Sequence, residues 1–179
     1  NLNTTAPTVT INQAAGQVDP TNALPINFTA VFSEPVSGFT NSDVTIGGTA
    51  GGAKTVTVTG SGATYNIAVS GMTSGTVIAS IPANGANDAA GNGNAASTST
   101  DNTVTYDICI PPLSGDWEIT TNCVLVDKNF TVDGDIYIRS TGILDMQGST
   151  SIVFSGNPRY IYIDSGGNLF QSNTAGFNK

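Results

Sequence analysis

A single stretch, INFTAVFSEPV at residues 26–36, decides the fold of the first part of the chain. From Ile26 to Phe32 every second residue is apolar. An extended strand places alternate residues on one face, whereas a helix would need apolar residues three and four positions apart. The stretch therefore predicts a strand that buries the side chains of Ile26, Phe28 and Phe32.

Similar alternation extends on both sides of this stretch, over residues 6–107. Gly, Asn, Asp, Ser and Pro separate the alternating runs, as tight turns require. Short strands spaced in this way over about 100 residues are typical of an immunoglobulin-like β-sandwich, so we expect an all-β fold of that kind for residues 1–107. The expected strands are 8–13, 24–33, 43–46, 54–59, 64–70, 76–81 and 102–107.

Three runs in this segment, PTVTI at 7–11, the stretch 26–36 and DAAGNGN at 88–94, together resemble bacterial Ig-like repeat domains. The resemblance covers residues 6–107 and holds in order along the strands. Such domains occur in tandem in secreted and cell-surface proteins such as adhesins, where they act as stalks and spacers. The resemblance thus implies structural support or binding outside the cell.

The tail, residues 108–179, repeats itself at an offset of 25 residues, which aligns IYI at 136–138 with IYI at 161–163. A repeat of this length with Gly at the corners is typical of a β-solenoid, and the tail resembles the start of a right-handed parallel β-helix. A small second β-sandwich with two similar hairpins is the alternative. The side chains expected to point inward are Ile136, Ile138, Leu144, Ile152, Phe154, Ile161, Ile163 and Leu169.

The charge and composition exclude several classes of function. The 179 residues include 13 acidic and 5 basic ones, for a net charge of -8, which opposes binding to nucleic-acid phosphates. The chain has no histidine, so mechanisms that need an imidazole are excluded. No apolar run approaches the roughly 20 residues that span a bilayer, and we expect no membrane span. The first residue is Asn, which suggests a processed product or a fragment.

Cys109 and Cys123 are the only cysteines, and the chain offers no histidine to complete a metal site with them. A disulfide between them would close a loop of 15 residues and would stabilise the fold by about 3 kcal/mol. Disulfides persist outside the reducing cytosol. We expect this bridge and with it an extracellular location; two buried free thiols are the alternative.

Three acidic residues in expected loops, Glu34, Asp88 and Asp101, are candidate ligands of calcium. Carboxylate oxygens from several loops can gather Ca²⁺, and the turn at 88–94 could add carbonyl oxygens. Tight turns also need Asp, Asn and Gly for their own geometry, so turn formation explains the same residues without a metal.

Asn3, Asn27 and Asn129 begin Asn-x-Ser/Thr triplets and are candidate glycan acceptors in an extracellular protein. Chance triplets are also expected in a chain this rich in Asn and Thr.

A catalytic role would rest on Asp133 and Asp135, which flank Gly134, with Arg159 beside them at the repeat offset. Enzymes that degrade polysaccharides on a β-helix use carboxylates and basic residues on its surface. The same three residues also form an ordinary surface ion-pair group, which requires no function. We expect no catalytic residues.

The sequence therefore predicts a non-enzymatic extracellular structural protein, either a cell-surface adhesin or stalk or a fibre subunit that associates end to end. Exposed Ile161, Ile163 and Leu169 on the last coil would provide the contact. The rival hypotheses are a carbohydrate-binding accessory module, which could bind surface glycans, and the first part of a β-helical enzyme that degrades polysaccharides. Only the aromatic residues Trp117, Tyr137, Tyr160 and Tyr162 of the tail could hold a sugar by stacking.

Overall fold

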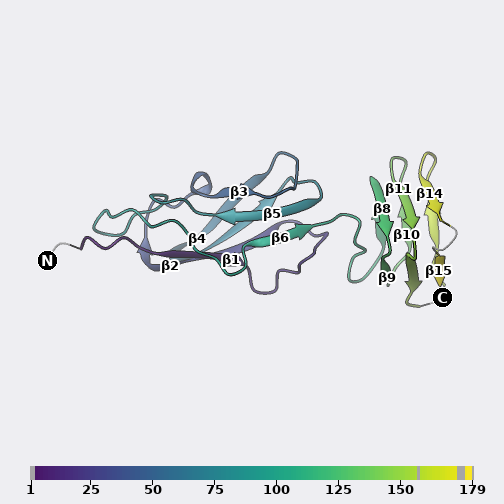
Figure 1. Cartoon of the computed structure of the whole chain (residues 1–179), viewed down its shortest axis with the longest axis horizontal. Helices are drawn as coiled ribbons and strands as arrows, with labels where there is room; N and C mark the ends of the chain where they lie inside the picture. The colour runs from purple at the N-terminus through teal and green to yellow at the C-terminus, as the bar shows by residue number, and fades with distance from the viewer. Residues whose placement is uncertain (1–2, 157, 173–175, 179) are drawn as a thin grey trace. The chain divides into compact units, whose positions relative to one another are not determined.

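The computed structural model describes residues 3–156, 158–172 and 176–178. The chain divides into two compact units, Asn1–Asp107 and Ile108–Lys179. In Figure 1 the colour runs from purple at the start of the first unit to yellow at the end of the second. Both units are built from β-strands, and within the described residues the one helical element is the short 3-10 helix η1 (Asn41–Asp43). No helix in this described part is long and apolar enough to cross a membrane.

Unit 1 is a β-sandwich of two three-stranded sheets with the orders β1-β2-β4 and β3-β5-β6. Neighbouring strands within both sheets are antiparallel, and the predicted sandwich is confirmed. Its strands are β1 (Val9–Gln13), β2 (Ile26–Val36), β3 (Thr45–Gly47), β4 (Thr55–Ser70), β5 (Gly75–Ser80) and β6 (Thr103–Tyr106).

Strand β2 supplies the centre of this core, as the alternation predicts. Ile26, Phe28 and Ala30 are completely buried, while Val31, which follows Ala30, is 45% exposed. From the second sheet Val77 and Val104 are also completely buried. An apolar face on each sheet is therefore removed from water, and this burial is the main stabilising contribution to the unit. The aromatic rings of Phe32, Phe39 and Tyr65 pack edge to face beside this centre.

The two strands expected at 54–59 and 64–70 belong to the single element β4. The chain turns back on itself at Gly62, whose φ of 70° lies in the left-handed region that favours glycine. A Cβ atom added to Gly60 would meet the carbonyl oxygen of Thr64, so the residues before the turn lie beside those after it. Both runs are extended as predicted, but the alternation gave no sign that they form one continuous element.

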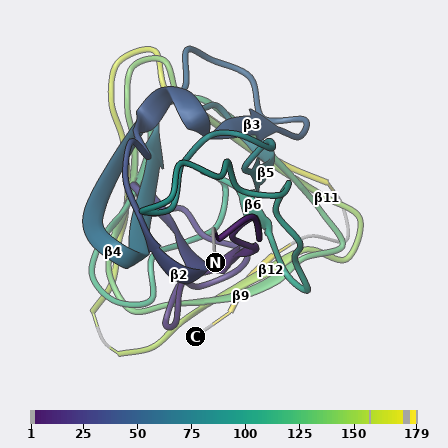
Figure 2. The same ribbon diagram turned by 90° about the vertical axis from the view of Figure 1, so that its left-hand side faces the viewer.

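Unit 2 consists of three parallel three-stranded sheets, with the orders β13-β10-β7, β14-β11-β8 and β15-β12-β9. The chain passes through one strand of each sheet in turn, and we call the passes coil 1 (β7 to β9), coil 2 (β10 to β12) and coil 3 (β13 to β15). In Figure 2 the coils overlie one another in a three-sided outline. The strands are β7 (Trp117–Ile119), β8 (Asn122–Val126), β9 (Asn129–Val132), β10 (Ile136–Ile138), β11 (Ile143–Gln147), β12 (Ser151–Phe154), β13 (Ile161–Ile163), β14 (Asn168–Gln171) and β15 (Gly176–Asn178).

All pairs of named strands in the described part of unit 2 are parallel, so the hairpins of a second sandwich do not occur there. Ile136 pairs with Ile161 and Leu144 with Leu169, which is the register of the sequence repeat. Coil 1 is shorter than the repeat, since Trp117 pairs with Ile136. The repeat is therefore visible only between coils 2 and 3.

The glycines of the repeat mark a corner where successive coils touch. A Cβ atom on Gly142 would overlap the carbonyl oxygen of Ile119 in coil 1, and one on Gly167 would overlap that of Ile138 in coil 2. The repeated glycine thus permits the backbone of each coil to approach the preceding one.

Most of the predicted inward side chains form one buried cluster. Ile136, Ile138, Leu144 and Ile152 are completely buried in coil 2. Phe154, Ile161 and Leu169 are partly buried against the same cluster, which also holds Trp117 of coil 1. Ile163 of coil 3 is 49% exposed although it has an inward position.

Candidate functional site

The outward side of sheet β13-β10-β7 carries three tyrosines, and we call it the tyrosine face (Glu118, Tyr137, Arg139, Tyr160, Tyr162 and Asp164). In each IYI tripeptide the isoleucines point inward, so the alternation of a strand directs the tyrosine outward. The parallel register then places Glu118, Tyr137 and Tyr162 in one row across the sheet. The rings of Tyr137 and Tyr162 stack with their centroids 4.8 Å apart and their planes 13° apart.

Tyr160, which precedes β13, extends the aromatic surface. It is 52% exposed, Tyr162 is 43% exposed, and their ring centroids lie 6.0 Å apart. Carboxylates hold the backbone here, because Tyr160 N–H donates to Asp135 and Asp135 N–H donates to Asp116, each at 2.9 Å. Trp117 is only 2% exposed, so the expectation that it could stack on a sugar is wrong.

Arg139 is the central charge of the tyrosine face. Its guanidinium lies 4.6 Å from the centroid of the Tyr137 ring, forms an ion pair with Glu118, and lies 3.6 Å from a carboxylate oxygen of Asp164. The hydrogen bond with Glu118 is the largest cause that raises the pKa of Arg139. Burial, followed by the charges of Asp116 and Asp135, raises the pKa of the Tyr137 hydroxyl. The tyrosine face therefore presents the neutral phenol of Tyr137 among carboxylates.

The candidate catalytic residues, Asp133, Asp135 and Arg159, lie close together near the tyrosine face. Arg159 is 3.6 Å from Asp133, and the side chains of both residues are partly exposed. Asp135 uses a carboxylate oxygen to accept the Tyr160 N–H. An exposed ion pair of this kind contributes little to stability and is no sign of catalysis.

The carboxylate of Asp88 in unit 1 accepts four hydrogen bonds. Asp88 is 4% exposed, and its oxygens accept hydrogen bonds from the N–H groups of Ala90 and Asn92 and from the side-chain amides of Asn92 and Asn3. The side-chain hydrogen bond from Asn92 is the largest cause that lowers the pKa of Asp88. This carboxylate organises the turn at 88–94.

The three predicted calcium ligands, Glu34, Asp88 and Asp101, do not converge. In the described parts of the chain no three His, Cys, Asp or Glu side chains form a group that could hold a metal ion. The bonds around Asp88 favour the turn-forming explanation, because the amide donors already saturate its oxygens.

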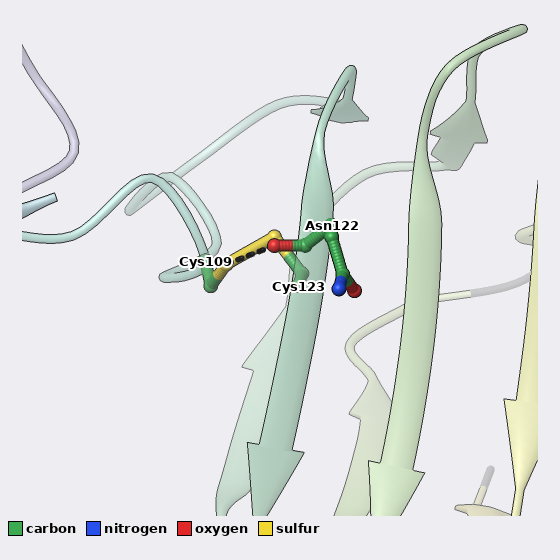
Figure 3. The surroundings of a disulfide bond; sticks show 3 residues. All are labelled: Cys109, Asn122 and Cys123. Atoms are coloured by element: carbon green, nitrogen blue, oxygen red, sulfur yellow. Dashed lines mark hydrogen bonds between the residues drawn. A yellow bond between two sulfur atoms is a disulfide. The ribbon is translucent and has the colours of Figure 1, made fainter. Parts of the chain in front are cut away.

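The predicted disulfide between Cys109 and Cys123 is confirmed, with Cα atoms 5.2 Å apart. Cys123 lies in β8, so the bridge fixes the segment before coil 1 to the first strand of its sheet. Figure 3 shows Cys109 beside this strand, its Sγ 3.8 Å from the carbonyl oxygen of Asn122. Cys109 also packs against the buried cluster of unit 2.

The candidate glycan acceptors differ in accessibility. Asn3 and Asn129 are exposed, and Asn27 is half-buried on the side of β2 that faces away from the core. Asn3 donates its amide to Asp88, and Asn129 accepts a hydrogen bond from Ser151. Glycosylation of these residues stays a prediction.

Sequence reasoning missed the ion pairs of Arg139 with Glu118 and Asp164. The signal was present for Asp164, because it lies one repeat after Arg139. The shorter offset of coil 1 conceals Glu118, since its position opposite Tyr137 follows only from the observed register.

Residues 3–108 match a protein-family model described as a bacterial Ig-like domain. The comparisons with curated proteins and with solved structures find no match.

Proposed function

The chain belongs over residues 3–108 to the bacterial Ig-like domain family, and from this premise we propose that it is a structural module of a bacterial surface or extracellular protein. The family match is the single observation that carries the proposal, because domains of this kind are typical of such proteins. In our proposal the module acts as a stalk or adhesin and catalyses no reaction.

The disulfide supports a location outside the cytosol. Cytosolic thiols are kept reduced, whereas a bridge such as Cys109–Cys123 persists in an oxidising compartment. This is independent of the family match, since both cysteines lie beyond its last residue.

We further propose that unit 2 is a β-solenoid, with the right-handed crossovers that parallel strands almost always have. Parallel sheets in which each strand pairs with the one three elements later support this proposal. Such a stack transmits force along its axis through many backbone hydrogen bonds, which suits a stalk. Its ends provide the contact for end-to-end association.

Two observations favour a non-catalytic role. Hydrolysis of a glycosidic bond needs a general acid whose pKa is raised, whereas hydrogen bonds lower the pKa of Asp88 and of Asp127. Asp133 is engaged with Arg159 on the surface. The purified chain should therefore release no reducing ends from neutral or acidic polysaccharides; such release, lost in Asp133→Asn, would overturn this part of the proposal.

The functional test is deletion of the segment that encodes the chain in the bacterium that carries it. We expect cells that attach poorly to a surface or to one another but grow at the normal rate in suspension. Complementation with the unaltered segment should restore attachment. Normal attachment of the deletion strain would contradict an adhesin or stalk role.

The exposed rings of Tyr160 and Tyr162 favour a second candidate function, binding of a neutral surface glycan. Tyrosine rings pack against sugar rings, and the neighbouring carboxylates accept hydrogen bonds from hydroxyl groups. Retention of the chain on insoluble cellulose or chitin should be lost in Tyr160→Ala. The matched control is Phe170→Ala, because Phe170 is equally exposed, at 54%, but lies on another sheet. Equal retention of all three proteins would exclude the tyrosine face.

A further inference from the structure

Leu113, in the segment before coil 1, is the most exposed large apolar residue in the described part of the chain. It is 90% exposed, whereas the other exposed large apolar residues are at most 54% exposed. Ser114, Gly115 and Asp116, which follow it, are also exposed. A single exposed leucine is ordinary by itself, so its significance depends on the backbone around it.

The backbone around Leu113 is not held by hydrogen bonds. In the part of the chain that the structure describes, the N–H groups of Leu113, Ser114 and Gly115 donate no hydrogen bond. The first strand of coil 1 is held, since the N–H of Trp117 donates to the carbonyl of Asp135 at 2.8 Å. A segment opens at little cost in free energy when it breaks few hydrogen bonds, and exposed loop tips are the preferred sites of proteolytic cleavage.

The residues on both sides of Leu113 match what the binding groove of a protease accepts. Pro111 and Pro112 fix φ at about −65° and disfavour the helical conformation in the residue before each of them, so the chain reaches Leu113 in an extended form. The small residues Ser114 and Gly115 follow. A serine protease of the chymotrypsin type holds the side chain before the cleaved bond in an apolar slot, and leucine has the chemistry for that slot.

Other exposed apolar residues of unit 2 lack this freedom of the backbone. The N–H of Tyr160 donates to Asp135, and its carbonyl accepts the N–H of Ile136. Phe170 lies within β14 and pairs with Asp145 of β11. Cleavage at Tyr160 or Phe170 would require paired backbone to open first, which costs more free energy than a local change at Leu113.

The disulfide encloses the free segment. Cys109 precedes Leu113, and Cys123 follows it in β8. Any cut between the two cysteines therefore leaves the resulting pieces joined by the bridge. Coil 1 begins at Trp117, after the segment, so such a cut removes no strand from the stack.

We propose that the Leu113–Ser114 bond is the processing site of an extracellular serine protease with an apolar specificity pocket, and that the Cys109–Cys123 bridge keeps the products joined. Water is the co-reactant: the C–N bond between the two residues breaks, Leu113 acquires a carboxylate and Ser114 an amino group. The product is a two-chain protein, residues 1–113 and 114–179, which separates only when the bridge is reduced. This rests on the proposed location outside the cell, where disulfides persist.

The first test is brief digestion of the purified, oxidised chain with a low concentration of chymotrypsin. The first product should gain the mass of one water, stay one species without reductant, and separate into residues 1–113 and 114–179 after reduction. Leu113→Asp and Ser114→Pro should slow this cut by at least about tenfold. Leu113→Lys should transfer the sensitivity to trypsin, whose pocket holds a basic side chain. The matched control is Phe170→Asp, which removes an exposed apolar residue from paired backbone and should leave the cut unchanged.

The second test examines the chain recovered from the bacterium that carries it. We expect a new N-terminus at Ser114 after reduction, absent from cells that produce Ser114→Pro. A first chymotryptic cut at another bond, or fragments that separate without reductant, would overturn the proposal. Recovery of the chain from cells only with the Leu113–Ser114 bond intact would also overturn it. Exposure of the chain on intact bacteria is measured separately, so failure of either test leaves the proposed location standing.

Discussion

At the scale of single residues, Asp88 makes the stability of the turn at 88–94 depend on pH. Hydrogen bonds, chiefly that from the Asn92 side chain, lower the pKa of Asp88 in the folded state below the ordinary value of 3.8. A carboxyl whose pKa is lowered by folding contributes stability above its ordinary pKa and loses it as the pH falls through the folded value. The turn should therefore be stable near neutral pH and should loosen in acid.

The first prediction concerns this turn. In Asp88→Asn the amide hydrogens of Ala90 and Asn92 should lose protection from exchange at neutral pH, because the amide oxygen is a weaker acceptor than the carboxylate and the amide nitrogen would face the side-chain donors of Asn3 and Asn92. The same hydrogens should lose protection in the unaltered chain only below about pH 4. Hydrogen exchange measured by NMR gives both quantities. The control is the exposed Asp101→Asn, and unchanged protection in Asp88→Asn would show that the carboxylate is not the organising group.

The disulfide supports a second prediction at this scale. Replacement of both Cys109 and Cys123 by Ser should lower the free energy of unfolding of unit 2 by about 3 kcal/mol, because the bridge restricts the unfolded chain. The single tryptophan, Trp117, lies in unit 2 and reports its unfolding in urea by fluorescence. Reduction of the unaltered protein should reproduce the loss. Identical unfolding curves for all three samples would be incompatible with a stabilising bridge.

At the scale of elements, the alternation in β2 separates a core face from a solvent face. Phe28→Ala should destabilise unit 1 by about 3–5 kcal/mol, since it removes a completely buried ring and leaves a cavity. Val31→Ala on the exposed face of the same strand should change stability by less than about 1 kcal/mol. Calorimetry of the two variants measures the contrast. Equal losses would contradict the assignment of faces.

The repeated glycine provides the corresponding prediction for unit 2. Gly142→Ala should destabilise the stack by about 1–3 kcal/mol, because the added methyl group meets the backbone of Ile119. Trp117 fluorescence in urea again follows the unfolding. Gly47→Ala is the control, since a Cβ atom there has open space. If Gly142→Ala were as stable as the unaltered chain, the coils would be farther apart at this corner than the structure has them.

The sequence predicts those elements whose side chains have a clear period. The alternation located every strand of unit 1, and the 25-residue repeat gave the register between coils 2 and 3. It did not give the register of coil 1, because the length of each corner there differs and leaves no repeated pattern. The inclusion of the runs 54–59 and 64–70 in the single element β4 was not predicted, since periodicity says nothing about whether two runs are continuous.

The candidate sites likewise divide into those that the sequence pattern reveals and those that it conceals. The Cys109–Cys123 bridge could be predicted because no other partner exists for either cysteine. The tyrosine face could be predicted only in part, since Arg139 reaches Glu118 through a register that the sequence conceals. The proposed calcium ligands illustrate the remaining difficulty: turn residues and metal ligands are the same residue types, and only their convergence distinguishes them.

At the scale of the whole molecule, the chain comprises an Ig-like sandwich and a unit of stacked parallel coils. Neither unit contributes an arrangement of side chains that we assign to catalysis. Burial of alternating apolar faces stabilises the sandwich, and stacking of coils together with a disulfide stabilises unit 2. The proposed mechanical and adhesive roles both require that this chain lie outside the cell.

The central claim is therefore that the chain lies outside the cell, and brief proteolysis of intact bacteria tests it most directly. Peptides of both units, identified by mass spectrometry, should be released from intact cells under conditions that leave cytosolic proteins uncut. The account predicts this release, or the presence of the chain in the culture medium, with Cys109 and Cys123 recovered as a disulfide-linked peptide. Recovery of these peptides only after the cells are broken open, with both thiols reduced, would contradict it.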